Sequence, residues 1–140
     1  MGGVIDSSVF VRGERRRFEA REILQLIQEH LPGEQTLLSS IVVAELVHGI
    51  YRAHTSGEAA RRRAYVRDIL GSLPLVGFSE RAAWIAGQIR GEQGRLGNTL
   101  PFADSLIAGI AMELDFAVLT LNVKDFARVP GLRVVPFVLP

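Results

Sequence analysis

A chain of 140 residues has the length of one domain, and 48% of its residues are hydrophobic. It contains no cysteine, which excludes disulfide bonds, thiolate metal ligands and cysteine nucleophiles. The formal net charge of +1 gives the whole molecule no strong attraction to nucleic acid or to a membrane surface. No N-terminal signal pattern is visible, and no apolar run approaches the roughly 20 residues of a membrane span. We therefore expect a cytoplasmic protein, one domain over residues 1–140, with no membrane partner.

Short apolar segments alternate with longer amphipathic segments along the chain, which predicts an α/β fold. Strands are expected at residues 4–5, 36–39, 73–76, 116–119 and 132–136. Helices are expected at residues 14–31, 41–53, 58–70, 79–89 and 101–114. This alternation is typical of a mostly parallel sheet with helices packed against it.

Glycine and serine residues set several of the predicted boundaries. A turn is expected near Gly13, and Ser40 is expected to cap the helix that follows it. Three glycines between residues 91 and 97 are expected to end the preceding helix in a flexible segment. The pair Gly2–Gly3 could shorten the first strand, because glycine is unfavourable in strand interiors.

Four acidic residues fall where a parallel sheet would form a ligand site, beyond the carboxyl ends of its strands. Asp6 ends the first predicted strand, and Asp125 follows a later one. Asp104 lies in the first turn of the helix that leads to that later strand. Glu45 lies on a helix that is apolar on both flanks. Taken singly, the aspartates are explained by helix caps and turns, and Glu45 by a buried ion pair with an arginine.

Taken together, these acids indicate a cation site. Two carboxylates about 4 Å apart repel each other by roughly 4 kcal/mol at an effective dielectric constant of about 20. Such a cluster must bind either protons or a hard cation. Oxygen ligands without cysteine or clustered histidine favour Mg²⁺ or Mn²⁺ over zinc. A pair of carboxylate-held Mg²⁺ ions is a common means of cutting phosphodiester bonds.

The mean hydropathy of +0.22 is high for a monomer, so we expect a partner or a second copy to cover part of the apolar surface. All basic residues except Lys124 are arginine. Arginine suits bidentate phosphate contacts, although a GC-rich genome would give the same bias.

Four segments of the chain resemble, in order and spacing, the motif blocks of PIN-domain nucleases, and more narrowly those of the VapC toxins of bacterial toxin–antitoxin modules. They are residues 5–10 (IDSSVF), 45–49 (ELVHG), 101–108 (PFADSLIA) and 119–126 (LTLNVKDF). The resemblance implies a PIN-like three-layer α/β/α fold with a central, mostly parallel five-stranded sheet. It also implies a Mg²⁺-dependent endoribonuclease that hydrolyses RNA with metal-activated water, with Mn²⁺ as a substitute ion. The expected partners are RNA, a cognate antitoxin and a second copy in a homodimer.

Carried over by position, the resemblance implies the role of each acid. Asp6 and Asp104 would be direct metal ligands. Glu45 would complete the site, either by holding metal-bound water or by acting as a base. Asn122 stands where some members of the family have aspartate. Either Asp125 then supplies that charge, or the site has one acid fewer and its second metal ion is in question.

Two hydroxyl residues, Ser8 and Thr120, match positions that hydrogen-bond the acids in the family. His48 lies one helical turn from Glu45 and is expected to pack rather than to act in catalysis. A receiver domain is the nearest alternative fold, but it needs an acidic pair after the first strand, where this chain has Ser7–Ser8. A catalytically degenerate PIN domain that binds RNA or a partner remains the functional alternative, and Asn122 is its only support.

Overall fold

The computed structural model describes residues 1–140 and contains one five-stranded sheet in the order β3-β2-β1-β4-β5. The strands are β1 (Gly2–Ile5), β2 (Gln35–Ser39), β3 (Leu75–Val76), β4 (Ala117–Thr120) and β5 (Val134–Pro136). All four pairings are parallel. In the central register, Val4 of β1 lies opposite Leu37 of β2 and Val118 of β4. The predicted five-stranded parallel sheet is confirmed, although β3 and β5 are shorter than the sequence suggested.

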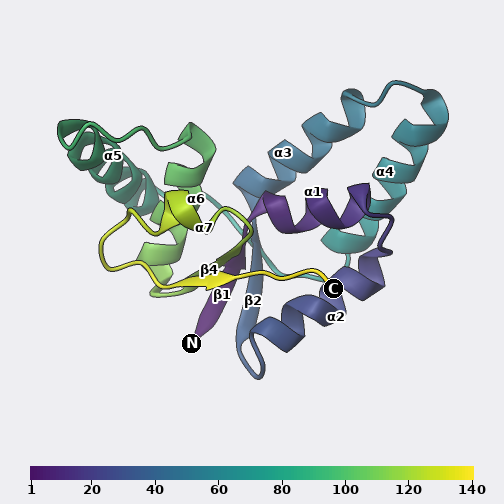
Figure 1. Ribbon diagram of the computed structural model, residues 1–140, viewed down its shortest axis with the longest axis horizontal. Coiled ribbons are helices and arrows are strands. Elements are labelled where there is room, and N and C mark those ends of the chain that lie inside the picture. The colour runs from purple at the N-terminus through teal and green to yellow at the C-terminus, as the bar shows by residue number, and fades with distance from the viewer.

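Helices cover both faces of this sheet, which confirms the three-layer arrangement. They are α1 (Ser7–Arg15), α2 (Ala20–His30), α3 (Ser40–Tyr51), α4 (Ser56–Leu70), α5 (Glu80–Arg95), α6 (Phe102–Leu114) and α7 (Val123–Phe126). Helices α1 to α4 lie on one side of the strands, and α5 to α7 lie on the other (Figure 1). None of these helices is both long and apolar enough to cross a membrane.

The strand order places the switch point of the sheet between β1 and β4. From β1 the chain moves outward to β2 and β3, then crosses back to form β4 on the opposite side of β1. Helices that connect the strands in these two directions diverge at the carboxyl ends of β1 and β4, which is where ligands bind in open α/β sheets. Asp6 follows β1 directly, and its backbone N–H donates to the Leu119 carbonyl oxygen of β4 at 3.0 Å.

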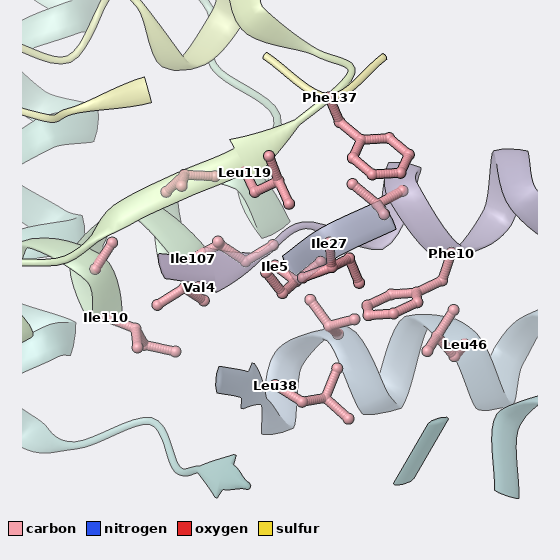
Figure 2. Close-up of a cluster of buried hydrophobic side chains, with 14 of the residues drawn as sticks. Val4, Ile5, Phe10, Ile27, Leu38, Leu46, Ile107, Ile110, Leu119 and Phe137 are labelled. Atoms are coloured by element: carbon pink, nitrogen blue, oxygen red, sulfur yellow. The ribbon is translucent and has the colours of Figure 1, made fainter. Parts of the chain in front are cut away.

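The hydrophobic core is centred on β1 and β4, whose residues are all buried. Parallel strands covered on both faces read as continuous apolar runs, as these do. Figure 2 shows Ile107 and Ile110 of α6 on one side of Val4 and Ile5, with Phe10 of α1 on the other. Burial of one such side chain contributes about 1.5–3 kcal/mol to stability.

The glycines at the start of β1 do not shorten the strand, contrary to our expectation. Gly2 and Gly3 are both in β1 and both buried. A Cβ atom added to Gly3 would lie 2.5 Å from the Leu31 side chain, and one added to Gly2 would lie 2.7 Å from the Gln35 carbonyl oxygen. Neighbouring elements therefore approach the strand closely because it has no side chains there.

The prediction of one helix over residues 14–31 is wrong, because two helices occupy this region. Helix α1 begins at Ser7 and ends at Arg15, and Gly13 lies inside it, packed against Ile23, rather than in a turn. The chain reverses through Arg17, which has a φ of 65°. Glu19 then begins α2 with a capping box, in which its backbone N–H donates to the Glu22 carboxylate at 2.8 Å.

Two other helix boundaries differ from prediction. Ser39, not Ser40, caps α3, since its hydroxyl accepts a hydrogen bond from the Val42 N–H at 3.2 Å. Helix α5 runs through Gly91 and Gly94 to Arg95 instead of ending near residue 89. The helix survives these glycines because its inner face keeps regularly spaced buried residues, including Ile89 and Gln93.

A glycine in α6 sets the distance to α5 and gives a test of the packing. A Cβ atom at Gly109 would lie 2.5 Å from the Ala82 carbonyl oxygen, a backbone atom that cannot rotate away. Gly109→Ala should therefore destabilise the protein by about 1–3 kcal/mol in denaturant titrations. Gly87→Ala on α5 is the matched control, because no atom lies within 4 Å of the added Cβ. It should be neutral or stabilising by up to about 1 kcal/mol. Equal losses from both variants would contradict this close packing.

Candidate functional site

Asp6 is fixed at the switch point by two hydroxyl groups. It occupies the N-cap position of α1 and is 3% exposed. Its Oδ2 accepts hydrogen bonds from Ser8 Oγ at 2.7 Å and from Thr120 Oγ1 at 2.8 Å. Each hydroxyl in turn accepts a backbone N–H, from Leu121 for Ser8 and from Asn122 for Thr120. This network ties the segment after β4 to the end of β1 and leaves the buried Oδ1 of Asp6 with no hydrogen-bond partner.

Asp104 and Asp125 are joined through Asn122. Asp104 lies in the first turn of α6, and Asp125 lies in α7. The Asn122 side-chain nitrogen donates to Asp104 Oδ2 and to Asp125 Oδ2, both at 2.8 Å. Because both acceptors are carboxylates, the nitrogen rather than the oxygen of the amide must face them. Asp125 is also 3.6 Å from the Arg128 guanidinium, an i,i+3 pair on the short α7 turn.

Glu45 approaches the same place from α3, on the opposite side of the sheet from α6. Its Oε1 is buried and has no hydrogen-bond partner. Burial raises the pKa of Glu45, the Ser7 side chain offsets part of that rise, and the Asp6 charge adds to it. The unpartnered oxygen and the raised pKa both indicate a carboxylate that lacks compensating positive charge.

The pKa of Asp104 depends on the other three acids of the cluster. Burial is the main cause that raises its pKa to about 7, and the charges of Asp6, Asp125 and Glu45 raise it further. The hydrogen bond from Asn122 acts in the opposite direction. The other three predicted acids therefore all lie close enough to raise the pKa of Asp104, as expected if the four share a site.

The site contains the oxygen donors that a hard cation prefers, but these donors do not yet converge on one point. No group of three or more His, Cys, Asp or Glu side chains is arranged to hold a metal ion as the side chains stand. Asp104 and Asp125 are instead tied to the Asn122 amide. Two buried carboxylate oxygens, Asp6 Oδ1 and Glu45 Oε1, are nevertheless unpartnered. Oxygen donors of this kind suit Mg²⁺ or Mn²⁺, and a divalent ion would relieve their mutual repulsion. The residues present therefore fit such an ion.

Sequence reasoning missed some contributors to the site. The Ser7 side chain lowers the pKa of Glu45 through a hydrogen bond, and Arg128 pairs with Asp125. The i,i+3 spacing of Asp125 and Arg128 was a readable signal. Buried Gln93 was also missed. Its side-chain nitrogen donates to the Arg128 carbonyl at 2.9 Å, and its oxygen accepts from Asn98 at 3.0 Å.

These Gln93 contacts anchor the segment that leads into α6. The Asn98 backbone N–H also donates to the Gln93 carbonyl oxygen, at 2.9 Å, and Arg90 donates to the Leu100 carbonyl oxygen, at 3.2 Å. The glycine-rich stretch thus ends in a well-bonded turn just before the helix that carries Asp104. Gln93 could not be found from the sequence because its partners lie up to 35 residues away.

His48 does not pack in the interior, contrary to our expectation. It is exposed on α3 and lines a pocket of about 360 Å³ between α1, α3 and α4. Ser7 and Glu45 line the same pocket, so it adjoins the acidic cluster.

The parallel five-stranded sheet and the acids at its switch point are features of one class of protein. A family model described as "PIN domain" matches residues 3–132, so the chain belongs to the PIN domain family. Within that family it is of the VapC type. A tRNA(fMet)-specific endonuclease VapC from Salmonella typhimurium is 35% identical over 97 residues, which are 69% of this chain and 71% of the relative.

Two further relatives extend the match over the chain. Ribonuclease VapC1 of Rickettsia felis is 27% identical over 134 residues, which are 96% of this chain and 95% of the relative. The crystal structure of DNA-bound VapBC from Salmonella typhimurium superposes with a TM-score of 0.82 at 27% identity, covering 99% of each chain. The prediction of a PIN-domain nuclease of the VapC type is confirmed.

The raised pKa of Asp104 gives a pH test in metal-free buffer. Between its ordinary value of 3.8 and about 7, the native state keeps the proton that the unfolded chain loses. Stability contributed by this group is therefore present at low pH and lost as pH rises towards 7. Asp104→Asn removes the ionisation, so its melting temperature minus that of the unchanged protein should increase from pH 5 to pH 8. Asp68→Asn, which removes an exposed carboxylate on α4, is the control for the loss of one negative charge. A flat difference for Asp104→Asn would contradict the raised pKa.

Proposed function

We propose that this protein is the toxin of a toxin–antitoxin pair and acts as a Mg²⁺-dependent endoribonuclease. The observation that carries the proposal is the pair of buried, unpartnered carboxylate oxygens on Asp6 and Glu45, next to an Asp104 carboxyl with a raised pKa. A site that repels its own charges is suited to a divalent cation. The similarity to VapC ribonucleases supports RNA as the substrate.

Asp6 and Asp104 would hold the ion, with Glu45 and Asp125 completing the charge around it. Asp6 offers Oδ1, because Oδ2 is already occupied by two hydroxyl donors. Asp104 offers Oδ1, because Oδ2 accepts from Asn122. Bound Mg²⁺, or Mn²⁺ in its place, would supply a Lewis acid for the phosphodiester and activate the attacking water.

The side chains of this chain have separable tasks in that reaction. Ser8 and Thr120 hold Asp6 in one orientation. Glu45 Oε1 is free to accept a proton from the attacking water, and its raised pKa brings it closer to the working pH of a general base. Asn122 orients Asp104 and Asp125 without adding charge, so this site has one acid fewer than a family member with aspartate at that position.

The proposed partners are RNA, an antitoxin protein and a second copy of the chain, all in the cytoplasm. The structural neighbour from Salmonella typhimurium is a VapBC complex, which supports the antitoxin. Several large apolar side chains are exposed, among them Trp84 at 77% and Leu96 at 72% on or next to α5. Apolar side chains left in solvent on a chain of this hydropathy support coverage by another polypeptide.

A second candidate function is RNA or partner binding without cleavage. Asn122 favours it, because its amide already compensates two of the carboxylates in place of a cation. Cleavage requires Asp104 as a metal ligand, whereas binding without cleavage does not, so Asp104→Asn distinguishes the two functions.

Asp104→Asn should abolish cleavage while preserving the fold. The amide oxygen can still accept from Asn122, and a repelling charge is removed, so the metal-free variant should melt at least as high as the unchanged protein. Replacing a direct ligand should weaken Mg²⁺ binding and RNA cleavage by at least about 100-fold, more than the 10–100-fold typical of residues that only support a ligand. RNA binding through arginine side chains should survive.

Three measurements decide this: calorimetric Mg²⁺ affinity, the Mg²⁺-dependent rise in melting temperature, and cleavage of a structured RNA. Asp68→Asn is the control and should match the unchanged protein in all three. Full cleavage by Asp104→Asn would overturn the proposed mechanism. Normal Mg²⁺ binding by the unchanged protein without any RNA cleavage would favour the binding function instead.

The proposed homodimer predicts a solution mass of twice the 15.4 kDa chain. Multi-angle light scattering at micromolar concentration measures it directly. Because exposed apolar side chains are the proposed cause and Trp84 is 77% exposed, Trp84→Lys should shift the mass towards that of the monomer. A monomeric mass for the unchanged protein would contradict the dimer.

A further inference from the structure

The pocket between α1, α3 and α4 is continuous with the acidic cluster but chemically different from it. It has a volume of about 360 Å³, and only 5 of its 14 lining residues are hydrophobic. Ser7 and Glu45 lie where it meets the acids, whereas Arg15, Arg52, His48 and His54 are basic side chains farther along. A pocket of this size is at the lower end of the range for small-ligand sites.

Helix geometry shows how the pocket extends away from the acids. On α3, Glu45, His48 and Arg52 follow an i, i+3, i+7 spacing and therefore share one face. At 1.5 Å per residue, Arg52 lies roughly 10 Å along the axis from Glu45. On α1, Ser7 and Arg15 are eight residues apart and both line the pocket, roughly 12 Å from each other along the axis. Each helix thus carries one residue beside the carboxylates and an arginine roughly two turns farther along the axis.

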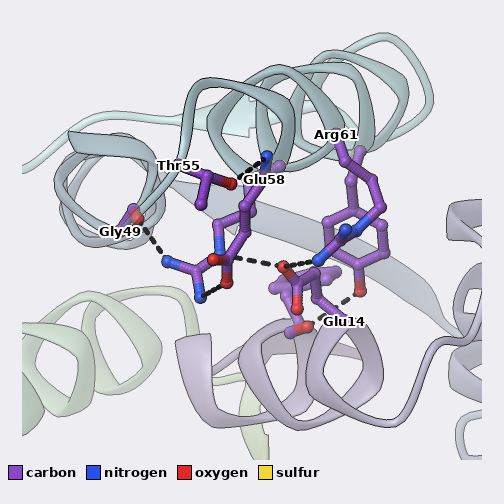
Figure 3. Close-up of polar contacts among 8 residues, drawn as sticks. Glu14, Gly49, Thr55, Glu58 and Arg61 are labelled. Atoms are coloured by element: carbon purple, nitrogen blue, oxygen red, sulfur yellow. Dashed lines mark hydrogen bonds and ion pairs between the residues drawn. The ribbon is translucent and has the colours of Figure 1, made fainter. Parts of the chain in front are cut away.

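Part of the pocket lining is already neutralised by an internal ion-pair network, some of which Figure 3 shows. Arg62 donates to Glu14 at 2.9 Å, to the Gly49 carbonyl oxygen at 2.8 Å and to Glu58 at 2.8 Å. Arg61 lies 3.9 Å from Glu14 as well. The acid Glu14 and the base Arg62 therefore satisfy each other and leave little charge for a ligand.

The basic side chains at the rim of the pocket, in contrast, are not paired with acids. Arg15 and Arg52 are exposed and have no hydrogen bond or ion pair with any protein group. His48 and His54 are also exposed. Two free guanidinium groups and two imidazole rings thus surround a pocket whose only uncompensated acid, Glu45, belongs to the catalytic cluster.

We propose that this pocket is the subsite for the single-stranded RNA segment next to the scissile phosphate. Arg15 and Arg52 bind its phosphates, and His48 and His54 stack on a base. This inference rests on the function proposed above and names where that substrate lies. Single-stranded RNA is bound in this way elsewhere, by a basic groove that follows the backbone and by side chains on which bases stack.

The charges favour RNA over a polypeptide in this pocket. An RNA strand that is cut at the acidic cluster must extend beyond it. In this pocket the phosphates of the extending strand lie near unpaired arginines rather than near more acids. An amphipathic peptide would need a mainly apolar groove, whereas most of the lining residues here are polar. A polypeptide occupant is therefore an outcome of the test rather than the proposal.

The test measures RNA binding without cleavage. A fluorescein-labelled, random-sequence, single-stranded 12-nucleotide RNA is titrated in EDTA and followed by fluorescence anisotropy. The double variant Arg15→Ala/Arg52→Ala should bind at least about 10-fold more weakly, and the dependence of log K on log salt should become shallower by about 1.4 for two lost phosphate contacts. The control Arg81→Ala/Arg95→Ala removes the same charge from exposed arginines of α5 and should change binding less than about 2-fold.

Stacking of a base on His48 and His54 is tested with a second pair of substitutions. His48→Ala/His54→Ala should weaken binding of the 12-nucleotide RNA but not of an abasic ribose-phosphate chain of the same length. Arg15→Ala/Arg52→Ala should weaken both. Equal losses from the pocket and control arginine variants would mean that net charge alone binds the RNA, and would overturn the subsite. Unchanged RNA binding with loss of antitoxin binding would overturn it in favour of a polypeptide.

A small phosphodiester separates failure of the subsite from failure of the nuclease. With Mg²⁺, the unchanged protein should hydrolyse bis(p-nitrophenyl) phosphate, which is too short to reach the pocket, and the Arg15→Ala/Arg52→Ala variant should have a raised KM for RNA. If the unchanged protein cleaves neither substrate, the proposed nuclease fails, and the binding data in EDTA still decide the subsite.

Discussion

Mutual repulsion among buried and half-buried carboxylates is the constraint on which the rest of the site depends. Asp6, Glu45, Asp104 and Asp125 come from four separate elements, and folding brings them together at the ends of β1 and β4. This arrangement opposes folding of the metal-free chain. The structure tolerates it through local compensation, with two hydroxyls on Asp6 and one amide shared between Asp104 and Asp125. Helix position also helps, because Asp6 and Asp104 each lie at the start of a helix, where negative charge is stabilised.

The compensation is incomplete, and the incomplete part is what gives the site its chemistry. One oxygen of Asp6 and one of Glu45 are shielded from water without receiving a hydrogen bond. A fully satisfied network would make a stable protein with nothing to offer a cation or a proton. Here hydrogen bonds hold one oxygen of Asp6 and one of Asp104 and leave the other oxygen of each available, as expected of a preorganised site.

Charge is distributed along α1 and α3 in a way that suits a phosphodiester chain. Each helix carries an acidic or acid-adjacent group at the site and an unpaired arginine near its carboxyl end. Arg62 of α4 holds α1 and α3 in place by donating to Glu14 of α1 and to the Gly49 carbonyl oxygen of α3. Asp6 and Glu45 of the acidic cluster therefore lie on the same two helices as the proposed RNA subsite, and this common scaffold fixes the spacing between them.

The sequence by itself determined the fold class, the five strands and the acids, because continuous apolar runs and acids at strand ends are local patterns. It could not place the break between α1 and α2, since that depends on the Glu19–Glu22 capping box and on Gly13 packing against Ile23. It also misjudged His48 and overlooked Gln93, whose surroundings come from distant segments. Tertiary structure alone decided which carboxylate oxygens are unpartnered and which arginines are free, because both depend on contacts between residues far apart in the chain.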